Sequence, residues 1–173
     1  METILTHAYA VLANTPARWQ VLIEKLPPEL LTQPPAPGEW SALDCLQHLI
    51  DTERWVFAQR IEAILAGRDF PAFDPDSQDE KPDAGQSPAD MVETFSRLRT
   101  INLPLFQKIT PADLERQARH SELGLVTMSQ LLHHWTSHDL MHTVQAERAL
   151  MQPFIQGCGP WQSYFSDHFV TTA

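Results

Sequence analysis

The sequence predicts an all-α fold, a four-helix bundle with long crossover loops that forms a single domain over residues 1–173. Three observations favour this fold. Apolar residues recur at three- and four-residue intervals in four long segments, which is the pattern of helices that bury one face. No segment shows a convincing alternation of apolar and polar residues, which would indicate a strand. The connections are roughly 15 to 20 residues long, so they can reach a non-adjacent corner of a bundle.

The first helix is predicted over residues 2–25. Pro27 and Pro28 end it, because proline lacks the backbone N–H group that continues a helix. Residues 27–40 contain five of the fourteen prolines of the chain and therefore predict a loop across the surface. The apolar stripe of this first helix consists of Ile4, Ala8, Leu12, Trp19, Leu22 and Ile23.

The second helix is predicted to begin at Ser41 and to run to Ala66. The Ser41 hydroxyl can accept a hydrogen bond from an amide of the first turn, and Asp44 stands at the third helical position, as in a capping box. Gly67 supplies the left-handed residue that commonly ends helices. Residues 68–86 are acidic, contain prolines and show no periodicity, so they predict a long loop.

The third and fourth helices complete the predicted bundle. Ser87 caps the third helix, Pro88 opens it, and Asp90 again occupies the third helical position. Pro104 is expected to kink or end this helix near its last turn. The fourth helix is predicted over residues 127–150 and is followed by an aromatic tail that glycines interrupt.

The charge and the cysteines exclude several classes of function. The chain has 22 acidic residues against 12 Lys and Arg, a formal charge of −10, so we expect no nucleic-acid partner. No uninterrupted apolar stretch approaches the roughly 18 residues of a membrane span, and the first residues lack the features of a signal peptide. Cys45 and Cys158 stand in no paired motif, which is typical of free thiols in a reducing compartment. We therefore expect a cytoplasmic protein without membrane contact.

The fourth helix carries the clearest indication of chemistry. It contains four of the eight histidines of the chain. His138 and His142 lie about 40° apart around the helix axis, in the middle of the apolar stripe. Two histidines four residues apart on one face can reach one metal ion. His134 and His138 have the same spacing, so His134 is a rival ligand to His142, and core histidines with ordinary hydrogen-bond partners are the alternative to a metal site.

Two imidazoles need a third ligand from another helix, and His48 in the second helix is the obvious candidate. It lies well away from the apolar centre of that helix, on the same side as Asp44. This side of the helix either meets solvent or lines a polar cleft. Asp51 lies about 60° from His48, and Gln145 lies about 20° from His138. Both are therefore candidates to hold the far nitrogen of a ligand ring or to move a proton. The alternative is a solvated carboxylate and an ordinary interface amide, and the catalytic residues themselves stay unknown.

Two phrases of the sequence, GEWSALDCLQHLIDTERW (residues 38–55) and HDLMHTVQ (residues 138–145), resemble the DinB-like superfamily. Its members are four-helix bundles in which one histidine of the second helix and a His-x-x-x-His pair of the fourth bind a divalent metal. By this resemblance, His48, His138 and His142 are the ligands of one divalent ion, and His134 lies outside the set. Nickel, zinc, iron and manganese all accept imidazole ligands, so the identity of the ion stays open.

The resemblance implies one leading function and one alternative. Three imidazoles leave a coordination position open, which is typical of a reactive metal site. Relatives include thiol-dependent transferases and metal-dependent hydrolases. The leading hypothesis is therefore a metal-dependent enzyme that acts on a small-molecule substrate, by hydrolysis or with a low-molecular-weight thiol. The alternative is a non-catalytic, metal-stabilised homodimer whose exposed aromatic residues bind a partner. A cleft beside the three histidines favours the enzyme, and a closed site favours the structural role.

Overall fold

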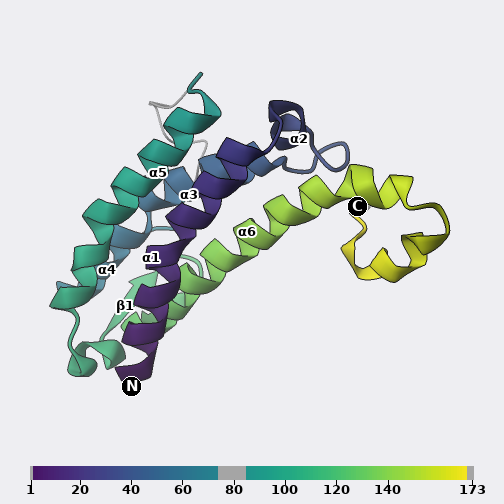
Figure 1. Cartoon of the computed structure of the whole chain (residues 1–173). Coiled ribbons are helices and arrows are strands. Elements are labelled where there is room, and N and C mark those ends of the chain that lie inside the picture. Colours follow the sequence, from purple (N-terminus) through teal and green to yellow (C-terminus); the bar gives the residue numbers. More distant parts are fainter. Residues whose placement is uncertain (1, 74–84, 171–173) are drawn as a thin grey trace.

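The structure is a computed structural model that describes residues 2–73 and 85–170. Long helices lie side by side in a bundle, and the last of them extends beyond the others toward the C-terminal segment (Figure 1). The bundle consists of α1 (Glu2–Lys25), α3 (Ala42–Trp55) with α4 (Phe57–Leu65), α5 (Pro88–Asn102) and α6 (Met128–Gly157). Shorter elements connect them: α2 (Pro28–Thr32), η2 (Leu103–Lys108), η3 (Pro111–Glu115), β1 (Gln117–His120), β2 (Gly124–Thr127) and η4 (Gly159–His168).

The predicted helix starts are confirmed by their hydrogen bonds. Ser41 and Asp44 form a reciprocal capping box at the start of α3, and Ser87 and Asp90 form one at the start of α5. Thr127 and Gln130 do the same for α6. Each box satisfies backbone N–H groups that a helix terminus leaves without partners, so these local sequences fix where three of the long helices begin.

Two of the predicted helices differ from the structure in their extent. The helix predicted over residues 41–66 is interrupted at Val56, whose backbone angles of φ −118° and ψ −72° separate α3 from α4. The last helix continues through Pro153 to Gly157, beyond the predicted end at residue 150. Pro153 removes only one helical hydrogen bond, and in the turn beyond it the buried Ile155 anchors the chain against the rest of the molecule.

The short helix α2 and the two strands were not predicted. Residues 27–40 include the helix α2, which Pro28 opens and the buried Leu31 holds in place. Strands β1 and β2 form an antiparallel hairpin, contrary to the expectation of no strand. Each strand has only four residues, too few for an alternating pattern to stand out. Most of the loop predicted over residues 68–86 lies outside the described residues, but Phe70 is described and exchanges backbone hydrogen bonds with the hairpin.

The packing of the helices places α3 and α6 against each other. Helix α1 packs against α5 and α6, and α3 packs against the same two helices, so α1 and α3 occupy opposite corners of the bundle. The long connection between them therefore crosses the bundle, as the predicted crossover loops require. The interface between α3 and α6 is where the functional histidines expected from the sequence meet. None of the helices in the described ranges combines the length and apolarity that crossing a bilayer requires.

A buried ionic network lies between two apolar clusters of the core. The guanidinium of Arg99 from α5 contacts rings from both clusters, Phe95 at 5.0 Å and Trp135 at 5.4 Å. It forms two hydrogen bonds with the Asp139 carboxylate, at 2.9 and 3.0 Å, and one with Glu53 at 2.7 Å. Only 1% of the Arg99 surface is exposed. The network thus ties α5 to both α3 and α6 in the interior of the bundle.

The charges of this network support one another. Burial opposes the charged form of Arg99, but Asp139 and Glu53 outweigh it and raise the pKa of the guanidinium above its ordinary value. Burial raises the pKa of Glu53, and Arg99 opposes this rise. Trp135 Nε1 also donates a hydrogen bond of 2.8 Å to Glu53. Glu53 therefore accepts from Arg99, Asn102 and Trp135, whereas both oxygens of Asp139 accept from Arg99, on which the charge balance of the network depends.

Candidate metal centre

The three histidines expected to bind metal converge at the interface of α3 and α6. His48 comes from α3, and His138 and His142 lie one turn apart on α6. One nitrogen of each ring lies within 4.8 Å of the others. His48 Nε2 and His138 Nε2 are only 3.0 Å apart. Among the described residues, no other group of three or more His, Cys, Asp or Glu side chains meets in this way.

The environment of the rings keeps all three histidines neutral at neutral pH. Burial, helped by the charge of His142, lowers the pKa of His48 from 6.5 to about 4. Burial, followed by the neighbouring histidines, lowers the pKa of His138 to about 3. Burial also lowers the pKa of His142, although Gln145 and Asp139 oppose it. Neutral imidazole carries the lone pair that a metal ion requires, so protons compete weakly for these nitrogens.

Gln145 orients one of the three rings. Its Oε1 accepts a hydrogen bond of 2.8 Å from His142 Nδ1, which leaves His142 Nε2 with its lone pair free. The sequence placed Gln145 closest to His138, whereas the structure places it on His142. Asp51, the other residue expected to support a ligand, accepts a hydrogen bond of 3.0 Å from Gln47 Nε2 within α3.

Aromatic side chains surround the histidines, and the sequence did not indicate this role. Trp40 stacks on His142 with ring centroids 5.6 Å apart and lies against His48 at 5.0 Å. Phe57 contacts His138 edge to face at 5.3 Å. In the sequence Trp40 was only part of a helix-start motif. Its position directly before the cap residue Ser41 is the signal that could have placed it, because the first turn of α3 is one turn from His48.

Other side chains of α3 and α6 that could bind a metal or react lie outside the convergence of the three rings. His134, the rival ligand, is exposed, and its ring meets His138 edge to face at 5.8 Å without joining the group of converging nitrogens. Glu53 and Asp139 belong to the Arg99 network. Burial, aided by Asp44, raises the pKa of the Cys45 thiol to about 12, so this thiol is not a nucleophile at neutral pH.

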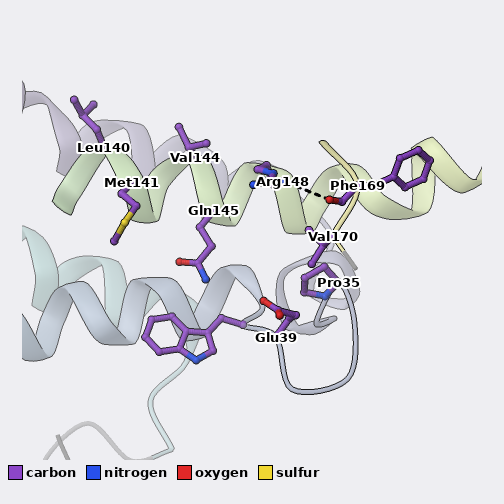
Figure 2. A pocket seen from close by; sticks show the side chains of 10 residues that line it. Pro35, Glu39, Leu140, Met141, Val144, Gln145, Arg148, Phe169 and Val170 are labelled. Atoms are coloured by element: carbon purple, nitrogen blue, oxygen red, sulfur yellow. Dashed lines mark hydrogen bonds between the residues drawn. The ribbon is translucent and has the colours of Figure 1, made fainter. Parts of the chain in front are cut away.

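An open cleft of about 700 Å³ adjoins the histidines. Figure 2 shows it between α6, which carries Gln145, and the segment before α3, which carries Glu39. Trp40 and Gln145 line the cleft and also contact the ligand rings. The remaining lining residues are Pro35, Leu140, Met141, Val144, Arg148, Phe169 and Val170. A cleft of this size accommodates a small molecule, and Trp40 and Gln145 stand between that space and the histidine rings.

The donor set fits a divalent metal ion. Two neutral imidazoles that face each other through Nε2 at 3.0 Å share at most one proton, and the third ring converges on the same region. A cation between these ring nitrogens would accept their lone pairs, which otherwise repel one another. His138 Nδ1 is buried and has no hydrogen-bond partner among the described residues.

Comparisons with known proteins agree with the fold. A family model described as the DinB superfamily matches residues 12–146. The solved structure of YfiT from Bacillus subtilis superimposes with a TM-score of 0.71 over 87% of this chain and 87% of that chain, at 19% sequence identity. Its description calls YfiT a probable metal-dependent hydrolase with an unusual four-helix bundle topology. A search of curated proteins gave no match. The predicted four-helix bundle is confirmed.

Proposed function

Since the chain belongs to the DinB superfamily, we propose that it is a metal-dependent enzyme that holds one divalent ion through His48, His138 and His142 and acts on a small molecule. The observation that carries the proposal is the convergence of three neutral imidazoles beside an open cleft. YfiT, which shares the fold, is described as a probable metal-dependent hydrolase. The reaction is hydrolysis or the transfer of a low-molecular-weight thiol.

The donor chemistry accommodates nickel, zinc, iron or manganese, all of which accept imidazole. A divalent ion would supply Lewis acidity, which activates water or a thiol as a nucleophile. The protein residues then have separate tasks. Gln145 fixes the orientation of His142, and Trp40 restricts the movement of the His48 and His142 rings.

The cleft indicates which kind of small molecule the enzyme accepts. Most of its lining is apolar, contributed by residues such as Leu140 and Val144. Glu39, Gln145 and Arg148 add the polar groups that would orient a substrate. A molecule with an apolar body and polar ends therefore matches the cleft, with its reactive group next to Gln145 and the ligand rings.

Metal analysis of protein purified without an affinity tag tests the metal site. We expect one divalent ion per chain in the wild type and loss of the ion in His138→Ala. His133→Ala is a matched control, because His133 lies on the same helix but is exposed and bonds Ser129 O at 2.8 Å. His134→Ala tests the rival ligand and should also keep the ion. An unchanged metal content in His138→Ala would contradict the site.

A second assay tests the reaction. Metal-loaded protein is screened against ester and amide substrates, and separately against low-molecular-weight thiols paired with electrophilic acceptors. Activity that disappears both on chelation and in His138→Ala supports the enzyme, provided that circular dichroism shows the variant folded. The two panels distinguish hydrolysis from thiol transfer. Turnover that survives in both conditions would show that the three histidines are not the site of reaction.

One observation favours a second candidate function, a partner-binding bundle. The segment after residue 150 exposes large aromatic side chains: Phe154 (62% exposed), Trp161 (64%) and Tyr164 (81%). Exposed aromatic residues are enriched at protein interfaces. In this reading the metal stabilises a homodimer and no reaction occurs. Sedimentation of the metal-loaded and metal-free protein tests it: a dimer that dissociates on chelation, without turnover in either substrate panel, favours this alternative.

A further inference from the structure

A second cavity, of about 350 Å³, lies where α4, the hairpin and α6 meet. Its lining includes Arg60, Phe70, His120, Val126, Leu131 and His134. The proposed enzyme site uses none of these side chains. The cavity borders the histidine centre: the ring of His134, which lines the cavity, meets His138 edge to face at 5.8 Å, and Phe57 contacts both rings, at 5.5 and 5.3 Å.

Arg60 brings a positive charge into this cavity, and the part of the chain that the structure describes supplies no acidic partner for it. The residue is 8% exposed. Its guanidinium lies 5.3 Å from the centre of the Phe70 ring, and Nη2 donates a long hydrogen bond of 3.4 Å to the carbonyl of Pro71. Among the described residues, no carboxylate lies within ion-pair distance of Arg60. A buried charge that is not paired is costly, so this position is one at which an anion would be stabilised.

His120 places a second donor beside Arg60. Its Nδ1 accepts hydrogen bonds from the backbone N–H groups of Glu122 and Leu123, at 3.2 and 3.4 Å. In a neutral ring the proton must then be on Nε2. Nε2 faces Arg60 Nη2 at 3.4 Å. Two N–H groups therefore face each other at 3.4 Å, and neither is an acceptor for the other.

The charges around the two donors agree with this arrangement. Burial, followed by the charge of Arg60, lowers the pKa of His120, and Glu122 opposes the shift. His120 is therefore neutral at neutral pH, with its proton on Nε2. Glu122 is exposed and forms no ion pair with either donor. The fixed charge in the cavity is that of Arg60 alone among the lining residues.

From this arrangement we infer that the cavity binds a small organic carboxylate whose body is apolar. The two carboxylate oxygens accept from Arg60 Nη2 and His120 Nε2, which lie side by side. The apolar body packs against Phe70, Val126 and Leu131. The volume is at the lower end of the range for ligand pockets, so the ligand is no larger than a single substituted ring.

Isothermal titration calorimetry with benzoate as the probe tests the site. Benzoate should bind the wild type more tightly than acetate, which lacks the apolar body, and benzamide, which lacks the charge, should not bind. Arg60→Met should weaken benzoate binding about tenfold or more, as expected for the loss of a charged hydrogen bond. Arg68→Met is the matched control, because Arg68 is exposed near the end of the same helix and should leave binding unchanged.

Two further variants separate this cavity from the histidine centre and guard against misfolding. A carboxylate can also bind a metal ion, so His138→Ala must bind benzoate as the wild type does. His120→Asn keeps an acceptor near the position of Nδ1 and removes the Nε2 donor, so it should bind benzoate several-fold more weakly even if Arg60→Met fails to fold. Equal binding of benzoate and benzamide, unchanged affinity in His120→Asn, or loss of binding in His138→Ala would each overturn the inference.

Discussion

Replacing Arg99 by methionine removes the one cation, among the described residues, that pairs with the buried carboxylates of Glu53 and Asp139. The Arg99 guanidinium bonds Asp139 at 2.9 and 3.0 Å, Glu53 at 2.7 Å and the carbonyl of Leu12 at 2.6 Å. Glu53 is 2% exposed and Asp139 is 1% exposed, so water cannot replace the lost donors. Methionine fills much of the same volume, and the substitution therefore tests the charge rather than a cavity.

We expect Arg99→Met to lower the free energy of unfolding by about 3–5 kcal/mol, the cost of breaking a buried ion pair from one side. This is a large share of the roughly 5–15 kcal/mol that stabilises a typical domain. Burial already raises the pKa of Glu53, and without Arg99, which opposes this rise, that pKa moves further above its value in the unfolded chain. The folded variant then binds more protons than the unfolded one, so its deficit relative to the wild type should shrink as the pH falls from 7 toward 5.

Urea unfolding of the metal-free protein, followed by circular dichroism at pH 7 and pH 5, measures both effects. Arg97→Met is the matched control, because Arg97 is exposed on the same helix and should change stability by no more than about 0.5 kcal/mol. Adding Glu53→Gln and Asp139→Asn to Arg99→Met should recover part of the loss. A loss of unfolding free energy below about 1 kcal/mol, or one that increases on acidification, would refute the explanation that Arg99→Met leaves two buried carboxylates without a cation.

Three further predictions follow from single contacts. Gln145→Leu should weaken metal binding about 10- to 100-fold in a competition titration with a chelator, because the His142 ring loses the acceptor that orients it; unchanged affinity would contradict that role. The pKa of His138 is lowered from 6.5 to about 3 in the folded protein. Below pH 6.5 the unfolded chain therefore binds a proton at this residue, whereas the folded metal-free protein does not. Stability should therefore fall on acidification, and His138→Gln should reduce this slope by about 1.4 kcal/mol per pH unit between pH 6 and 4 in urea titrations. Gly124→Ala should destabilise the hairpin by about 1 kcal/mol, because Gly124 has a φ of 78° that alanine adopts only with strain; equal thermal unfolding would argue against this.

The helices and their starting points could be predicted because each depends on a few neighbouring residues. The capping boxes of Ser41 and Ser87 are local hydrogen-bond patterns, and local patterns are visible in sequence. The interruption at Val56 and the continuation through Pro153 depend on packing with distant residues, so no local signal marks them. The hairpin was missed for a related reason, since its strands gain stability from the turn at Gly124 and from contact with Phe70.

The placement of His48 shows what apolar periodicity cannot predict, namely whether the polar side of a helix faces solvent or a polar interior. His48 lies off the apolar stripe of its helix, and the sequence left open whether that side meets water or a polar cleft. The structure turns it toward α6, where His138 and His142 provide the other side of a polar interior. Arg60 is the opposite case. Nothing in the sequence singled it out, and it lines a cavity only because the unpredicted hairpin brings His120 next to it.

The ionic network and the histidines depend on the same two helices. Helix α3 carries His48 and Glu53, and α6 carries His138 directly before Asp139. Moving α6 along α3 by one turn, about 5.4 Å, would separate His48 from His138 and would also break the bonds between Arg99 and Asp139. An apolar interface tolerates such a shift more easily, because apolar contacts have no fixed direction. The buried ions are expensive to desolvate, but their directed bonds permit only one register of the two helices, and in that register the three rings converge.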